Sequence, residues 1–277
     1  MSFLSWSKVI TSTTILSYLS DTFEEEFLYS GYFSRNCGSN LTLLINIFLY
    51  IFILMDISIY KSALTSLIIQ LIIGLLSLYG LSIKLEKNEL ILNQILLLET
   101  IVQFIEFSFY IWLVFNFSNI KVNVSLIRYI DWFITTPTML FSIISFFIYQ
   151  NVKPEFLSLK NIFYDNINIL TWIFGLNAFM LILGFSGEIK LINKYWATIL
   201  GFFGLIGSHY LIYTNFVGEK LINNYIFWFN FILWSLYGIA YMLSFKNKNI
   251  FYNILDVFAK NINGLLILAY ILYVKYN

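Results

Sequence analysis

The stretch Arg128–Ser142, RYIDWFITTPTMLFS, places an arginine and an aspartate inside an otherwise apolar and aromatic run. Ionisable side chains are costly inside a membrane, where they usually face other helices and serve a function. Asp131 and Thr135 lie one helical turn apart and Ser142 follows about two turns later, so the three can face one interior column. Arg128, nearly one turn before Asp131, can hold that carboxylate ionised and close one end of the column.

The composition around this stretch indicates a membrane protein. Of the 277 residues, 60% are hydrophobic and 11% are charged, whereas a soluble domain is typically about 25% charged. The net charge of +1 gives no electrostatic footprint for nucleic acid. The single cysteine, Cys37, excludes an internal disulfide and a cysteine-based metal site. We therefore expect an integral, multi-pass membrane protein with neither a metal site nor a nucleic-acid partner.

Long apolar runs predict an all-α architecture. A helix needs roughly 20 apolar residues to span the bilayer. Runs of that length predict spans at 41–60, 62–85, 91–117, 126–150, 166–186, 192–217, 222–245 and 250–274. The breaks between them are short and polar, so no soluble domain fits between the helices. Residues 1–39 are mixed in character, and we expect a tail there.

The last span, LDVFAKNINGLLILAYILY, carries a second charged pair. Asp256 and Lys260 are four residues apart and share one helix face. One interpretation is a buried ion pair that only orders the helix. The other is a lysine that forms a Schiff base with an aldehyde, because desolvation suits an uncharged amine nucleophile. The resulting cation needs anions nearby, and Asp256 and Asp131 could supply them.

Two of these stretches together resemble a known family. RYIDWFITTP and LDVFAK are similar to the third and seventh helices of the microbial (type 1) rhodopsins. Asp131, Thr135 and Ser142 match the three positions by which that family is classified, in the pattern (DTS motif) of viral rhodopsins from giant algal viruses. The resemblance implies a seven-helix retinal-binding bundle over residues 62–277. It leaves residues 1–61 as an N-terminal extension with an extra hydrophobic helix.

The resemblance also implies a cofactor and a site. All-trans retinal is expected on Lys260 as a protonated Schiff base, with Asp131 as primary counterion and proton acceptor and Asp256 as second counterion. Arg128 is expected to gate the extracellular side, and Thr135 to steady the Asp131 carboxylate. Gly238 stands where many members have a proline, which leaves room beside retinal. Further expected retinal contacts are Trp132, Trp234, Tyr237, Tyr241, Met139, Met180, Asn177, Gly184 and Tyr110.

The implied function is light-driven ion transport rather than enzymatic catalysis. An outward proton pump is the first expectation, and a light-gated channel for cations or protons is the alternative. A photosensory rhodopsin is a third possibility, although no transducer domain is fused to these residues. Expected partners are the lipid bilayer, protons or other cations, and further copies of the chain. For a viral protein, the expected location is a host cell membrane.

Five positions depart from the proton-pump pattern. Ser142 stands where pumps often hold a carboxylic acid that reprotonates the Schiff base. Glu99 either replaces that acid or simply reaches solvent near its helix end. Glu106 lies seven residues later on roughly the same face, and it either hydrates an ion path or stays protonated and bonds a neighbouring helix. At the other end, Lys246 and Lys248 stand where release glutamates are expected, which predicts proton release after uptake.

Overall fold

The computed structural model describes residues 58–119, 123–152 and 157–276. These residues are helical wherever they have regular structure, and they contain no strand. A π-helical turn, η4 (Tyr213–Val217), extends the fifth long helix, and a short helix, α6 (Leu159–Asp165), precedes the fourth. The seven long helices are α3 (Ile59–Leu81), α4 (Leu90–Phe115), α5 (Val124–Val152), α7 (Ile167–Glu188), α8 (Lys194–Ile212), α9 (Leu221–Tyr241) and α10 (Phe245–Tyr276).

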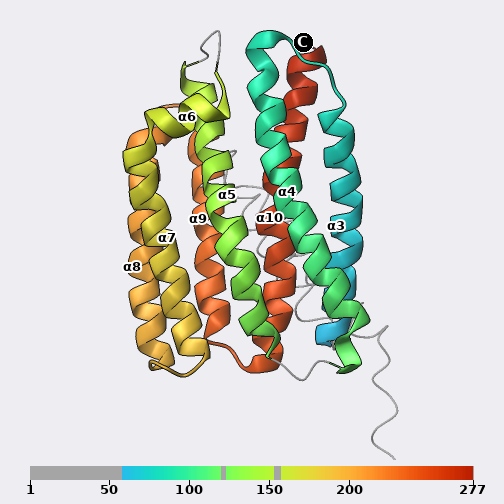
Figure 1. Cartoon of the computed structure of the whole chain (residues 1–277), viewed down its shortest axis with the longest axis vertical. Coiled ribbons are helices and arrows are strands. Elements are labelled where there is room, and N and C mark those ends of the chain that lie inside the picture. Colours follow the sequence, from blue (N-terminus) through green and yellow to red (C-terminus); the bar gives the residue numbers. More distant parts are fainter. Residues whose placement is uncertain (1–57, 120–122, 153–156, 277) are drawn as a thin grey trace, which may run out of the picture. The chain divides into compact units, whose positions relative to one another are not determined.

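The seven long helices close into a ring. Each helix packs against the next one along the chain, and α10 returns to pack against α3 (Figure 1). In addition, α10 contacts α4 and α5 through the inside of the ring. Side chains from α4, α5 and α10 can therefore meet in the interior, although they are far apart in the sequence.

The outward faces of the helices are apolar. Six of the described helices are long and apolar enough to cross a membrane. Large apolar side chains such as Leu75 on α3 and Phe203 on α8 are more than half exposed. By contrast, Gln70, Glu99 and Arg128 are buried. This distribution is the inverse of a soluble protein and suits a lipid environment, where polar groups need partners within the protein.

The predicted spans from residue 62 onward are confirmed as helices, with boundaries shifted by a few residues. The first helix begins earlier than expected, at Ile59, where the Ser58 side chain caps it by accepting from the Lys61 backbone N–H at 3.2 Å. The predicted span 41–60 lies outside the described residues apart from its last three. Helix α6 was not predicted, because it is a single short helix within a polar break. Its start is capped by Ser158, which accepts from the Asn161 N–H at 3.3 Å.

Candidate functional site

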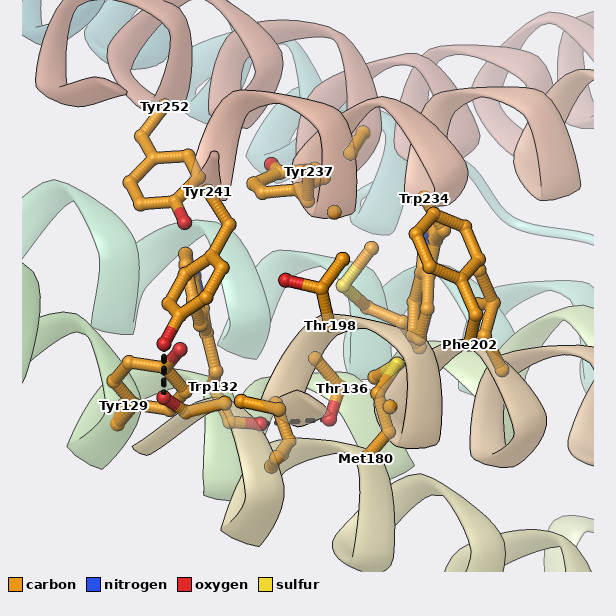
Figure 2. Close-up of a pocket in the computed structure, with 18 of the residues that line it drawn as sticks. Tyr129, Trp132, Thr136, Met180, Thr198, Phe202, Trp234, Tyr237, Tyr241 and Tyr252 are labelled. Atoms are coloured by element: carbon orange, nitrogen blue, oxygen red, sulfur yellow. Dashed lines mark hydrogen bonds between the residues drawn. The ribbon is translucent and has the colours of Figure 1, made fainter. Parts of the chain in front are cut away.

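An apolar cavity of about 110 Å³ lies between α5, α7, α8, α9 and α10. Aromatic side chains from several helices surround it, among them Trp132 and Trp234 (Figure 2). Lys260 also lines it and is only 2% exposed. An amine at the wall of an apolar, aromatic cavity fits a hydrophobic aldehyde such as retinal. The predicted contacts that line the cavity are Trp132, Met139, Met180, Gly184, Trp234, Tyr237, Gly238, Tyr241 and Lys260.

Two glycines in the cavity wall are tightly packed. A Cβ at Gly184 would lie 2.6 Å from the Tyr129 hydroxyl. A Cβ at Gly238 would lie 2.7 Å from the ring of Phe202. The space that a side chain at 238 would take is occupied by the ring of Phe202 from α8, and both residues line the cavity. Sequence reasoning missed Phe202, since nothing in α8 marks which of its many aromatic residues faces inward.

Two other predicted retinal contacts do not line the cavity. Asn177 lies behind the wall and donates from its Nδ2 to the Thr136 hydroxyl at 2.7 Å, so Thr136 takes the lining position. Tyr110 belongs to a different cluster, where its hydroxyl donates to Asp256 Oδ2 at 2.8 Å. The two corrections have different causes, because Asn177 bonds a residue of the wall while Tyr110 stands on α4, which contributes no residue to the wall.

Lys260 is in contact with two buried carboxyl groups. Its Nζ donates to Asp131 Oδ2, and Glu106 Oε1 lies 3.9 Å away. The second Asp131 oxygen, Oδ1, has no hydrogen-bond partner among the described residues, and neither does either oxygen of Glu106. The Asp131 carboxylate is thus closer to the Lys260 amine than Glu106 is, and its Oδ1 is free to accept a proton.

Arg128 pairs with Asp256 rather than with Asp131. The Arg128 Nη1 lies 2.6 Å from Asp256 Oδ2, and both side chains are fully buried. Tyr237 donates to the other Asp256 oxygen at 2.8 Å. The expected contact of Arg128 with Asp131 is therefore wrong, because Arg128 and two tyrosine hydroxyls bond Asp256. The physical reason is that α10 presents several acceptors to the guanidinium at once. The role of Asp256 as a second counterion to Lys260 stays a prediction.

Thr135 also differs from the prediction. Its hydroxyl donates to the backbone carbonyl of Asp131 at 3.0 Å rather than to the carboxylate. Threonine hydroxyls within helices commonly bond the carbonyl four residues earlier. Thr135 is buried on the expected face, but its proton is committed to the backbone.

On the other side of Lys260, Glu99 and Ser142 line the same small cavity, together with Asn263. Glu99 is fully buried, and the Ser142 side chain is the polar group in contact with its carboxyl. The two positions therefore come together as predicted. The alternative that Glu99 reaches solvent does not fit this burial.

A row of buried polar side chains without partners follows α3, α4 and α10. The members, which we call the polar seam, are Gln70, Gln103, Glu106 and Asn261, and every side-chain oxygen and nitrogen of these four lacks a partner among the described residues. An unpaired buried polar group costs about 1–3 kcal/mol. Water is the usual remedy when several such groups share an interior site.

Two features of the site were missed at the sequence level. Asn253 accepts from Arg128 Nη2, and its position seven residues before Lys260 was a signal that it shares the lysine's face. Glu188 at the end of α7 forms a buried pair with Lys248, at 2.6 Å. A carboxylate therefore lies beside Lys248, where the sequence of α10 showed none. It belongs to α7, so residue spacing within α10 could not reveal it.

Comparisons with known proteins agree on one family. The profile described as "Bacteriorhodopsin-like protein" matches residues 59–274. The viral rhodopsin OLPVRII has a similar structure, with 26% identity, a TM-score of 0.70, and coverage of 78% of this chain and 98% of that one. The blue light-absorbing proteorhodopsin from Med12 matches with 22% identity, a TM-score of 0.62, and coverage of 79% and 99%.

A third similar structure is the proton pumping rhodopsin AR2 from the marine alga Acetabularia acetabulum. It shares 18% identity and a TM-score of 0.59, with coverage of 76% of this chain and 92% of that one. No curated protein matches the chain. At such identities, AR2 and the proteorhodopsin support the fold alone.

Proposed function

The chain belongs to the bacteriorhodopsin-like family, and on that premise we propose that it is a light-driven ion transporter, first of all an outward proton pump. The observation that carries the proposal is the contact of Lys260 Nζ with Asp131 Oδ2 at the wall of an apolar cavity. A buried amine, a proton-accepting carboxylate and a cavity for an apolar aldehyde are the parts that such a pump needs. Each of the three comes from residues that the fold brings together.

The cavity residues are suited to hold retinal. Trp132 and Trp234 would enclose a planar polyene, while Met139, Met180 and Gly184 would contact its length or its ring. Joined to Lys260 in the all-trans form as a protonated imine, retinal would supply a light-sensitive cation that gives up its proton more readily after illumination.

Asp131 would accept the proton. Its Oδ2 contacts Lys260, and its Oδ1 is free of hydrogen bonds among the described residues. Arg128 is turned toward Asp256, so the Asp131 carboxylate is not already neutralised by the guanidinium. Asp131 Oδ1 therefore stays available to receive a proton from the neighbouring nitrogen.

Glu99 would return a proton from the cytoplasmic side. Ser142 cannot do so near neutral pH, because a hydroxyl does not ionise there. Glu99 lines the same small cavity as Ser142, and its carboxyl group forms no ion pair with the described residues that would hold it ionised.

A light-gated channel is the second candidate, and the polar seam favours it. Four buried polar side chains on α3, α4 and α10 lack hydrogen-bond partners among the described residues, and one of them, Glu106, lies beside Lys260. Hydrated, these groups would offer cations or protons a route past the cavity. A pump does not need this set of unpaired polar groups, so the seam is the specific observation for this alternative.

Photocurrents under voltage clamp distinguish the two candidates. A pump gives outward current at every voltage and acidifies the medium in a way that a protonophore abolishes. A channel gives currents that reverse near the equilibrium potential of the permeant ion, and the reversal moves when pH or cation concentrations change. Retinal-loaded protein that gives no current of either kind would exclude ion transport.

A further inference from the structure

Asn253 on α10 joins helix α3 to the buried arginine. Its Nδ2 donates to the Ser62 hydroxyl at 2.8 Å and to the Ile59 carbonyl at 3.2 Å. Its Oδ1 accepts from Arg128 Nη2, and the Tyr110 hydroxyl oxygen lies 3.2 Å away, although that hydroxyl donates over a shorter distance to Asp256. A carboxamide carries both donors and an acceptor. One neutral side chain can therefore donate to α3 and accept from Arg128 at the same time. Asn253 is fully buried, and its backbone carbonyl accepts from the Ser66 hydroxyl of α3 at 2.7 Å, which adds a further bond between the two helices.

The guanidinium of Arg128 has a choice of acceptors. Its Nη1 donates to Asp256 at 2.6 Å and to Tyr110 at 3.2 Å, and its Nη2 donates to Asn253. Asp131 lies nearly one turn away on the same helix, and its Oδ1 is unpaired among the described residues. A buried charged donor without an acceptor is unfavourable. Without Asn253, Nη2 would therefore gain by turning toward Asp131.

We propose that Asn253 is a positioning residue that holds Arg128 on Asp256 and away from Asp131. Asp131 then keeps a free carboxylate oxygen for the proton of Lys260. The inference rests on the proposed function only for the role of Asp131 as acceptor. The anchor itself applies equally to a pump and to a channel.

The anchor can be observed directly, because the sequence contains only two arginines, Arg35 and Arg128. Protein labelled with ¹⁵N-arginine and reconstituted in bilayers without retinal gives side-chain resonances that can be assigned with Arg35→Lys. In Asn253→Leu, the Nη resonances of Arg128 are expected to shift or broaden, since leucine keeps the volume but offers no acceptor. Resonances unchanged from the parent protein would overturn the proposal.

Asn249 provides a matched control on the same helix. It is buried like Asn253, but it bonds Ser125 at 3.5 Å and the Phe245 carbonyl at 2.9 Å. Asn249→Leu therefore removes a buried asparagine of α10 without removing an acceptor of Arg128. The proposal requires that the arginine resonances stay in place in this variant, and a shift as large as that of Asn253→Leu would refute it.

A second measurement uses retinal-loaded protein. Acid protonates Asp131 and changes the colour of the pigment, and the midpoint of this change reports how strongly nearby charges hold the carboxylate ionised. An arginine that turns toward Asp131 makes protonation harder, so more acid is needed. The other ionisable groups of this site are Lys260 and Asp256 from α10, Glu106 and Tyr110 from α4 and Tyr237 from α9.

In Asn253→Leu the colour change is expected to need more acid than in the parent protein, while Asn249→Leu keeps the parent midpoint. An unchanged midpoint in Asn253→Leu overturns the proposal. If that variant does not fold, Asn253→Asp serves instead, because aspartate keeps an oxygen for Arg128. The acid midpoint of Asn253→Asp is expected not to fall below that of the parent protein, and a fall would also overturn the proposal. If the parent chain forms no pigment with retinal, the proposed function fails. The arginine spectra, which need no retinal, still test whether Asn253 holds Arg128.

Discussion

At the scale of single residues, each buried cation of the site has its own carboxylate. Lys260 contacts Asp131, and Arg128 contacts Asp256. Isolated charges in a membrane interior are costly, and pairing reduces that cost. Glu106 is a third carboxyl group near Lys260, for which no further buried cation is present in the described part of the cluster. A neutral, protonated Glu106 would keep the charges of the dark site balanced.

Lys260→Ala should abolish the visible pigment, because it removes the amine to which retinal would be attached. The measurement is the absorption spectrum after retinal is added to the purified apoprotein. Lys275→Ala is the control, since this lysine is exposed in the last turn of the same helix. Visible absorption in Lys260→Ala equal to that of the control would contradict the assignment.

Glu99→Gln should slow reloading of the proton about tenfold or more, because glutamine fills the same space but carries no acidic proton. Flash spectroscopy of the retinal-loaded protein measures the decay rate, and added azide should restore it by delivering protons from solution. Glu86→Gln, at an exposed position before α4, should have no effect. An unchanged decay in Glu99→Gln would remove Glu99 from the mechanism.

At the scale of helices, close approach depends on small residues and paired amides. On α7, Gly184 lets the Tyr129 hydroxyl come within 2.6 Å of where a Cβ would stand, whereas Gly175 has nothing within 4 Å. Between α9 and α10, Asn230 and Asn263 bond each other reciprocally, at 3.1 and 3.0 Å. Both features can be tested by substitution with controls from the same helices.

Gly184→Ala should destabilise the pigment by about 1–3 kcal/mol, the usual cost of forcing extra volume into a packed site. Gly175→Ala, on the same helix, should be neutral or slightly stabilising, because alanine is the better helix former and meets no neighbour. Thermal bleaching of both variants makes the comparison. Equal bleaching temperatures would show that the wall at Gly184 can relax.

Asn230→Leu should destabilise the protein by about 1–3 kcal/mol, because it leaves the amide of Asn263 buried and unpaired. The double variant, with leucine at both positions, should recover part of this loss, since no unpaired amide then remains. A double-mutant cycle on thermal unfolding measures the coupling. Strictly additive losses would mean that the pair contributes no interaction energy.

The elements were more predictable from the sequence than the contacts were. Apolar runs bounded by polar breaks determine the long helices, because the bilayer sets their length. The meeting of Lys260 with Asp131 was also predicted, since each stands on a marked helix face. The partner of Arg128 was not, because it depends on which acceptors α10 offers at that depth. Asn253 and Phe202 escaped notice for the same reason, as their roles exist only between helices.

At the scale of the whole molecule, the proposed cofactor would contact five of the seven helices in the ring. The cavity is lined from α5, α7, α8, α9 and α10, while α3 and α4 contribute no lining residue. The proposed chromophore would therefore contact α5, α7, α8 and α9 but not α3 or α4, while α10 both lines the cavity and carries part of the polar seam. Loss of the cofactor should therefore affect the helices that line the cavity more than α3 and α4.

Retinal should raise the unfolding temperature by several degrees, because it binds the folded bundle and not the unfolded chain. Calorimetry of the apoprotein and of the pigment measures this difference. In Lys260→Ala, the gain on adding retinal should be smaller, since no covalent link can form. A pigment that unfolds at the temperature of its apoprotein would show that the cavity is equally well packed without a ligand.

The contact between Phe202 and Gly238 has a consequence for attempts to change the colour of this protein. The two residues come from adjacent helices and share one volume, because the Phe202 ring lies 2.7 Å from the place that a Cβ at Gly238 would occupy. A larger residue at 238 is compatible only with a smaller one at 202. A mutant library that varies either position alone would mostly return unstable proteins, whereas paired substitutions would reach a new set of chromophore environments.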